Sequence, residues 1–289
     1  MSNLAVMATY WNEADWIESS LKQISSIEPE FIVICEGNFD PRFNLHSNDG
    51  TKEIIDSWVN KRENALVISP VRKQKKEYLL KPHLFQTDQD SLPFKSILRL
   101  SQSILRNHLY RINQAATFAK MARLINLKMN TNKPKWLMTY DADQFYSDAL
   151  INFFKKSLNK VHGFQTCALE KTFFHNFSEY TTSYEQRRWN NMPFRFEPGM
   201  TVFPTRHFSY KRGKSHIFTY KENLYETHHQ YMHYKFRKSS ERDYMTYNLG
   251  DRKPPEEERV SGPYEKCTKK DHNEIIQSLI SNGWGKDYK

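Results

Sequence analysis

Three short apolar runs, joined by two segments of helical character, constrain the fold of this chain most strongly. The runs are residues 4–9, 31–35 and 65–69. The first connecting segment places Trp16, Leu21 and Ile24 at helical spacing, and the second predicts a helix over 52–58. Strand, helix and strand, repeated, predict an α/β fold whose open, Rossmann-like and mostly parallel central sheet carries helices on both faces.

A fourth apolar run, residues 136–140, ends in two carboxylates, Asp141 and Asp143. Side chains on a strand alternate between faces, so both project to the same side where the strand ends. Carboxylate oxygens suit Mg²⁺ or Mn²⁺, and ligands of α/β sheets bind at the carboxyl ends of the strands. Taken alone, the pair also fits a solvated surface loop. Its position after three predicted strands favours a metal site.

Residues 70–100 interrupt the alternation of strands and helices. Their first part surrounds the single acid Glu77 with basic side chains, namely Arg72, Lys73, Lys75, Lys76 and Lys81. This cluster indicates either a solvated loop or a contact for an acidic acceptor or an anionic membrane surface. After it, the pattern predicts one long helix over 101–130.

The second half of the chain is less regular. Helices are predicted from residue 148 and over 273–281, and we interpret the aromatic, charged segment 178–198 as a partly ordered wall over the site. Residues 205–242 are basic and histidine-rich. We expect one domain over 1–250, divided into the halves 1–145 and 146–250, and a C-terminal extension over 251–289.

Composition narrows the class of protein. The three cysteines are few and widely spaced, which argues against a disulfide framework or a zinc cluster and fits a reducing compartment. There is no run of about 18 apolar residues and no evident signal peptide. We therefore expect a cytoplasmic protein, with peripheral contact to a membrane surface as an option. The net charge of +10 fits phosphorylated, anionic-membrane or nucleic-acid partners.

Several motifs follow in an order that carries a resemblance. Asn12-Glu13 comes after the first strand and Glu36 ends the second, and these are followed by Ser47-Asn-Asp-Gly-Thr-Lys-Glu-Ile-Ile55, Arg111 with Asn113, Asp141-Ala-Asp143, and His233-Tyr-Lys-Phe-Arg-Lys-Ser239. Together they resemble GT-A glycosyltransferases, most closely the family 2 enzymes that use nucleotide sugars. The chain departs from many relatives at Gln144, where they carry Glu, and in its longer loop after Glu36.

The resemblance implies a metal site of Asp141, Asp143 and His233, occupied by Mn²⁺ or Mg²⁺. Asp143 then contacts the ion directly and Asp141 lies nearer the ribose or a metal-bound water. His228 and His229 are rivals of His233. The nucleotide sugar is expected to contact Thr9, Tyr10, Glu13, Glu36, Arg111, Asp141 and Lys235, with Arg212, Lys214 and Arg237 as further cations for the diphosphate.

The implied reaction moves a sugar from a UDP- or GDP-sugar to a hydroxyl of a glycan or glycoconjugate acceptor, with inversion as the expected outcome. An inverting enzyme needs a carboxylate base for the acceptor proton. The candidates are Glu197, which has the most family-like spacing after Asp143, Glu170 and Glu226.

Three other readings compete. A haloacid-dehalogenase-type phosphatase also places Asp-x-Asp after a strand, but that strand is usually near the start of its domain. A nucleotidyltransferase on a related sheet is a nearer alternative. A non-enzymatic nucleic-acid-binding protein is disfavoured because the chain has no RNP-like, zinc-finger or helix-turn-helix pattern.

Overall fold

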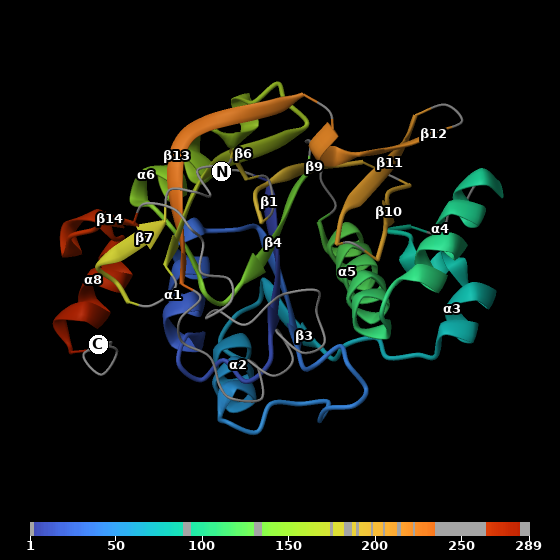
Figure 1. Ribbon diagram of the computed structural model, residues 1–289, viewed down its shortest axis with the longest axis horizontal. Helices are drawn as coiled ribbons and strands as arrows, with labels where there is room; N and C mark the ends of the chain where they lie inside the picture. Colours follow the sequence, from blue (N-terminus) through green and yellow to red (C-terminus); the bar gives the residue numbers. More distant parts are fainter. Residues whose placement is uncertain are drawn as a thin grey trace.

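The computed structural model describes most of the chain, namely residues 3–88, 94–129, 135–173, 176–181, 187–188, 191–197, 199–204, 206–212, 215–221, 223–234 and 264–283. Over these residues an 11-stranded central sheet is flanked by helices, and a separate three-stranded sheet lies toward one end of the molecule (Figure 1). No helix in the described ranges is long and apolar enough to cross a bilayer.

The first half of the central sheet is a parallel α/β unit. Its elements are β1 (Leu4–Tyr10), α1 (Ile17–Ile27), β2 (Phe31–Glu36), α2 (Thr51–Val59), β3 (Ala65–Ile68) and β4 (Lys135–Asp141). The strands lie in the order β3-β2-β1-β4, and each neighbouring pair is parallel. All four predicted strands are therefore confirmed. So is the α/β class, with a mixed sheet of mostly parallel strands compatible with a Rossmann-like fold.

Between β3 and β4 the chain forms α3 (Lys75–Leu80), the 3₁₀ helix η1 (Pro82–Phe85), α4 (Phe94–Arg106) and α5 (Leu109–Lys128). The single helix predicted over 101–130 is therefore wrong: it is the end of α4 followed by α5. The break has a local cause. Asn107 Nδ2 donates to the Ser103 carbonyl at 2.8 Å, and His108 has an extended backbone before α5. Asn side chains favour such breaks because they compete for backbone partners.

The segment after β4 completes the central sheet. It comprises β5 (Gln144–Tyr146), α6 (Asp148–Lys156), η2 (Leu158–Lys160), β6 (Gln165–Phe173), β7 (Glu179–Thr181), β8 (Arg187–Arg188), β9 (Phe194–Phe196), β10 (Thr201–Val202), β11 (Phe208–Arg212), β12 (Ser215–Phe218), η3 (Thr219–Lys221) and β13 (Leu224–Tyr234). Strand β9 pairs antiparallel with β4 and joins it to β6, and β13 runs parallel to β6 and antiparallel to β5. Strands β10 to β12 form the small sheet.

The C-terminal segment packs against this domain. It contains β14 (Tyr264–Lys266), η4 (Lys269–Asp271) and α8 (Glu274–Ser281), which confirms the predicted final helix. Strand β14 pairs with β7. Asn273, which caps α8, donates from Nδ2 to Gln23 Oε1 on α1 at 3.0 Å. The start of the predicted C-terminal extension, residues 251–263, lies outside the described residues.

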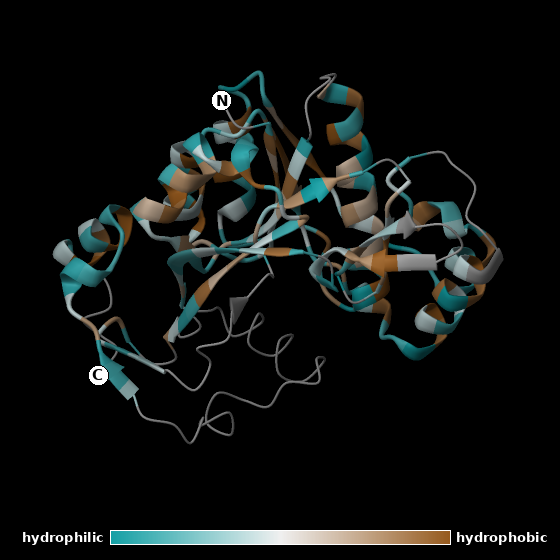
Figure 2. Ribbon diagram, turned by 90° about the horizontal axis from the view of Figure 1, so that it is seen from above, coloured by the Kyte–Doolittle hydropathy of each residue, from teal (hydrophilic) through white to brown (hydrophobic). Residues whose placement is uncertain are grey.

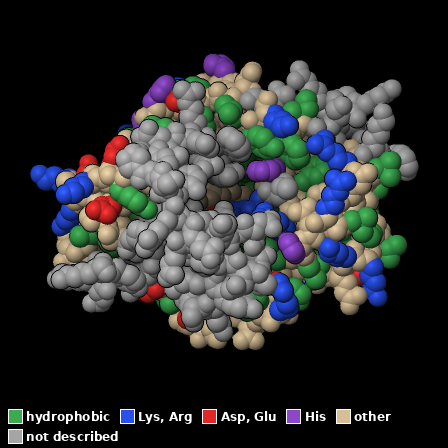
Figure 3. Space-filling view, in the orientation of Figure 1, with side chains coloured by type: hydrophobic (Ala, Val, Ile, Leu, Met, Phe, Trp, Pro, Cys, Tyr) green, Lys and Arg blue, Asp and Glu red, His purple; other side chains and the backbone are tan. Residues whose placement is uncertain are grey.

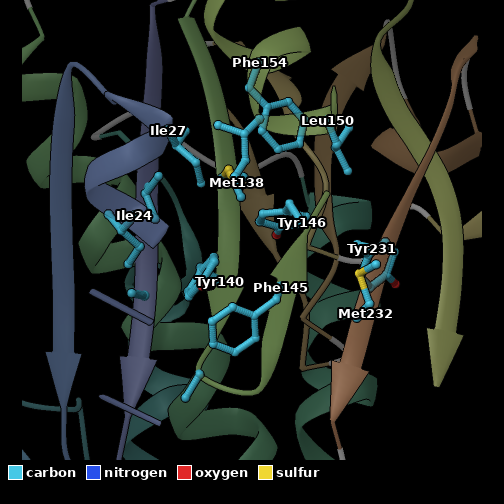
Figure 4. Packing of buried hydrophobic residues seen from close by; sticks show 14 of the residues in the cluster. Ile24, Ile27, Met138, Tyr140, Phe145, Tyr146, Leu150, Phe154, Tyr231 and Met232 are labelled. Atoms are coloured by element: carbon cyan, nitrogen blue, oxygen red, sulfur yellow. The ribbon is translucent and has the colours of Figure 1, made fainter. Parts of the chain in front are cut away.

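Alternation along the strands builds a hydrophobic core on each face of the sheet. On β1, Val6 and Ala8 face α1, whereas Ala5 and Met7 face α5. Figure 4 shows the first core, where Ile24 of α1, Met138 of β4 and Phe154 of α6 pack together. Brown, hydrophobic stretches follow the central strands in Figure 2. This burial on both faces is typical of parallel strands and holds their carboxyl ends in a fixed order.

Candidate active site

The carboxyl ends of β1, β2 and β4 lie side by side. Thr9 is in register with Asp141, and Tyr10 with Glu36. Asp143 follows β4 in a turn, and β13 crosses this point because His233 is the partner of Gln144 on β5. Three residues that the motifs predicted to act together, Asp141, Asp143 and His233, therefore meet at one edge of the sheet.

His233 connects Asp143 to a second carboxylate. Its Nε2 lies 3.5 Å from Asp143 Oδ2, and its Nδ1 lies 2.8 Å from Glu170 Oε1. Glu170 also accepts hydrogen bonds from the Tyr231 hydroxyl at 2.9 Å and the Thr172 hydroxyl at 3.1 Å. Because Glu170 accepts, Nδ1–H of His233 donates to it. Burial lowers the pKa of His233, but Asp143 and Glu170 together raise it above its ordinary value.

This geometry fits a divalent ion between Asp143 and His233. A histidine that ligates a metal through one nitrogen commonly donates the other N–H to a carboxylate, as Nδ1 does to Glu170. Two cis ligand atoms about 2.1 Å from an octahedral ion lie roughly 3.0 Å from each other, somewhat closer than the observed Nε2–Oδ2 separation of 3.5 Å. The described residues contain no group of three His, Cys, Asp or Glu side chains arranged around one point. Such an ion would need oxygens from a substrate or water.

Asp141 faces a cation that the motifs did not predict. Arg206 Nη2 lies 3.0 Å from Asp141 Oδ1, and Nη1 lies 3.3 Å from Oδ2. The guanidinium also stacks over Phe118 of α5, 5.4 Å from the ring centroid. Burial raises the pKa of Asp141, but Arg206 outweighs it and holds this pKa below its ordinary value. Asp141 therefore pairs with Arg206 rather than joining Asp143 and His233.

Asn191 links Asp141 to Gln144, the residue that replaces the acid of many relatives. Its Nδ2 donates to Asp141 Oδ2 at 2.9 Å and to Gln144 Oε1 at 2.7 Å, and its Oδ1 accepts from the Thr139 hydroxyl at 2.6 Å. Asn191 and Gln144 are both buried. Gln144 thus orients Asn191, and through it Asp141.

Arg206 also affects its neighbour His207, which packs against Tyr220 with ring centroids 4.7 Å apart. Burial, and then the charges of Arg206 and Arg111, lower the pKa of His207 to about 4. In the unfolded chain this pKa is about 6.5. Between these values the unfolded state binds more protons, so the free energy of unfolding falls as the pH falls.

We therefore expect the His207→Phe variant, which keeps the ring contacts, to lose less stability than the wild type between pH 6.5 and about 4. Urea unfolding midpoints across this range measure the slope. Burial also lowers the pKa of His272, which leaves a residual slope in the variant. Equal slopes for both proteins would show that His207 does not supply this dependence.

The residues predicted to hold the base and ribose have differing outcomes. Thr9 is beside Asp141 at the carboxyl edge, and its contact with the nucleotide sugar stays a prediction. Tyr10 does not, because its hydroxyl hydrogen-bonds with Ser20 Oγ at 2.7 Å inside the core. Only the backbone of Tyr10 reaches the edge, where its carbonyl accepts from Gly37 N–H at 2.8 Å. We correct the expectation accordingly.

Glu36 is at the edge but is engaged by the loop that follows β2. It accepts from the Ser47 amide at 2.8 Å and lies 2.5 Å from His46 Nδ1. The loop approaches β2 closely at Gly37, whose φ of 132° suits glycine, and a Cβ there would lie 2.4 Å from the Leu45 carbonyl oxygen. Glu36 therefore shapes the loop in this structure.

The Asp-Gly-Thr element closes on the residues after β1. Asp49 Oδ2 accepts from the Ala14 amide at 3.0 Å, and the Thr51 hydroxyl accepts from the Glu13 amide at 2.9 Å. Glu13 is buried. The element thus joins the two loops at the edge.

Arg72, one of the basic side chains in residues 70–100, has a structural role. Its guanidinium donates to backbone carbonyls of the loop after β2, those of Asn38 at 2.7 Å, Asp40 at 2.6 Å and Phe43 at 3.0 Å. Arg72 therefore holds this loop in place, and is not a solvated cation.

Arg111 begins α5 and lies near His207, on whose pKa it acts. It is therefore close to the site, as expected. Lys235, Lys214 and Arg237 lie outside the described residues. Of the rivals of His233, His228 is 3.9 Å from Glu226 and exposed, and His229 makes an edge-to-face contact with Phe153.

The three candidate bases do not meet at Asp143. Glu197 follows Phe196, which is the partner of Lys135 at the opposite end of β4. Six residues of strand, roughly 20 Å, separate Lys135 from Asp141. Glu226 is likewise near the start of β13, seven residues before His233. Glu170 is close, but it already accepts three hydrogen bonds and orients His233. The structure therefore places neither Glu197 nor Glu226 at the site.

Because Glu197 is exposed and distant from Asp143, we expect Glu197→Gln to retain turnover within about two-fold of the wild type. Initial rates with a saturating nucleotide sugar measure this. A loss of turnover with unchanged nucleotide binding would restore Glu197 as the base.

Comparison of this chain with known protein families and curated proteins identifies no relative. Neither the scan against protein-family models nor the search of curated proteins gives a match for this chain. The arguments on function therefore rest on the residues and their geometry.

Proposed function

We propose that this chain is a metal-dependent glycosyltransferase of GT-A type, which moves a sugar from a nucleotide-sugar donor to a hydroxyl of a glycan or glycoconjugate acceptor. One observation carries the proposal: Asp143 and His233 converge, with Glu170 behind His233, at the carboxyl edge where β1 and β4 end and Thr9 lies beside Asp141. Ligand sites of open α/β sheets lie at this edge.

Asp143 and the Nε2 of His233 would hold Mn²⁺ or Mg²⁺. When bound, the ion would neutralise negative charge on the departing diphosphate. Glu170 keeps the Nδ1–H of His233 directed away from the ion and fixes the ring. Tyr231 and Thr172 in turn orient Glu170.

Arg206 would bind the diphosphate in its own right. It is a cation next to the proposed ion site, and its planar guanidinium matches phosphate oxygens. Its backbone is held at a φ of 65°, which is uncommon for a residue other than glycine. In this role Arg206 would exchange its contact with Asp141 for one with the phosphate. Asp141 would then be available to the ribose, while its hydrogen bond from Asn191 keeps the carboxylate in place.

A hydrolysis screen of UDP- and GDP-sugars, with Mn²⁺, with Mg²⁺ and with chelator, tests the proposal. We expect release of a nucleoside diphosphate from at least one donor, and no release with chelator. No turnover and no binding of any donor or of free UDP or GDP would contradict it.

The nucleotidyltransferase alternative also needs a metal bound by carboxylates at a sheet edge. That activity would transfer a nucleoside monophosphate from a nucleoside triphosphate to the phosphate of a sugar phosphate and release pyrophosphate, so a second arm of the screen supplies these two substrates in place of the sugar nucleotide. Detection of pyrophosphate in place of nucleoside diphosphate would therefore replace one function with the other.

A further inference from the structure

Helices α3 and α4 carry apolar side chains that face solvent. Leu80 is 80% exposed, Leu98 49% and Leu105 62%. Leu98 and Leu105 are seven positions apart on α4 and therefore share one face, whereas Leu100 and Ile104 on the same helix are fully buried. The helix is thus apolar on its outer face as well as on its inner one.

The same two helices also carry exposed basic side chains. Lys75 Nζ donates to the Leu105 carbonyl at 3.3 Å, which places the start of α3 beside the end of α4. Lys76, Lys81 and Arg106 are exposed. In Figure 3, Lys and Arg side chains alternate with hydrophobic ones over the part of the face where α3 and α4 lie. We define the α3–α4 surface as Lys75, Lys76, Leu80, Lys81, Leu98, Leu105 and Arg106.

The charge of this region decides between partners. Residues 71–106 contain eight Lys or Arg against three Asp or Glu, which is half of the net charge of +10 of the chain. Two copies of such a surface repel each other, which disfavours self-association through the leucines. An anionic lipid surface attracts the cations, and its acyl boundary accepts the leucines.

We propose that the α3–α4 surface binds an anionic membrane. Helix α5 begins three residues after α4 ends, and near its start Asn113 Nδ2 donates to the Phe39 carbonyl at 2.7 Å in the loop after β2. The Leu105 end of α4 is therefore at the carboxyl edge of the sheet. This inference stands independently of the proposed reaction.

Co-sedimentation with phosphatidylcholine vesicles, with and without phosphatidylglycerol, tests the proposal. We expect the wild type to bind only the anionic vesicles and to dissociate at high salt. The combined variant Leu80→Ser, Leu98→Ser, Leu105→Ser should lose roughly ten-fold or more in partitioning. The control is Leu127→Ser on α5, which replaces a leucine of 76% exposure and should bind as the wild type does.

Thermal unfolding monitors the fold of each variant. Because the replaced side chains are exposed, we expect the Tm of each variant to stay that of the wild type. Equal binding by the triple variant and the wild type would overturn the proposal, as would equal binding to neutral and anionic vesicles. Light scattering measures whether the protein self-associates through this surface. A wild-type dimer that the triple variant abolishes would assign the surface to a second copy of the chain instead.

Discussion

Replacing Asp143 with Asn is expected to lower kcat for the donor sugar about a thousand-fold, equivalent to ~4 kcal/mol. The carboxylate is buried and lies beside His233 Nε2. The amide has nearly the same shape but lacks the charge that a divalent ion requires. The variant should also lose the thermal stabilisation that Mn²⁺ with a nucleoside diphosphate gives to the wild type. Steady-state kinetics and thermal shift measure the two effects.

Asp148→Asn is the matched control, because it changes an exposed acid at the start of α6, only five residues away. It should keep both turnover and Mn²⁺ stabilisation, and lose only a few tenths of a kcal/mol at the helix N-terminus. If Asp143→Asn turned over the donor at the wild-type rate, the ion would not be at this residue.

Replacing Gln23 with Leu is expected to have the largest effect on stability. The Gln23 amide is fully buried. Its Nε2 donates to the Tyr140 hydroxyl at 2.5 Å and to the Gln144 carbonyl at 2.9 Å, and its Oε1 accepts from the Tyr146 amide at 2.7 Å and from Asn273 Nδ2 at 3.0 Å. One side chain thus fastens α1 to β4, to β5 and to the residue that caps α8.

Leu fills a similar volume but leaves the Tyr146 amide and the Asn273 amide without this acceptor. Each buried polar group left unsatisfied costs about 1–3 kcal/mol, so we expect the free energy of unfolding to fall by about 4 kcal/mol and Tm by roughly 10 °C. Gln102→Leu, at an exposed position of α4, should change Tm little. Similar melting of Gln23→Leu and the wild type would mean that this hydrogen-bond hub does not support the fold.

The parallel half of the fold was predictable because its strands are buried on both faces. A continuous apolar run such as 31–35 is compatible with few structures other than a buried strand. The register of β1 with β4, which the structure shows, places Asp141 at the edge beside Thr9. His233 was predicted to lie near Asp143 only through the family resemblance. The register of β13 with β5 places it there.

The partners of the site were not predictable because they depend on tertiary contacts between distant segments. Arg206 lies 65 residues from Asp141 and Asn191 lies 50 residues away. A lone Arg in a basic stretch and a lone Asn carry no sequence signal of these contacts. Glu197 was chosen on its spacing after Asp143, but spacing cannot show that β9 runs antiparallel to β4 and carries Glu197 to the opposite end. The break between α4 and α5 was missed because Asn107 acts through one local hydrogen bond.

Binding of Mn²⁺, followed by the electron paramagnetic resonance signal of the free ion, tests the central claim most directly. With UDP or GDP present, the wild type should remove one equivalent of the free-ion signal, Asp148→Asn should do the same, and Asp143→Asn should remove little. Because this readout needs no turnover, it is independent of the donor sugar and the acceptor. If Asp143→Asn bound Mn²⁺ as tightly as the wild type does, or if the wild type bound none with either nucleotide, the metal site between Asp143 and His233 would be refuted.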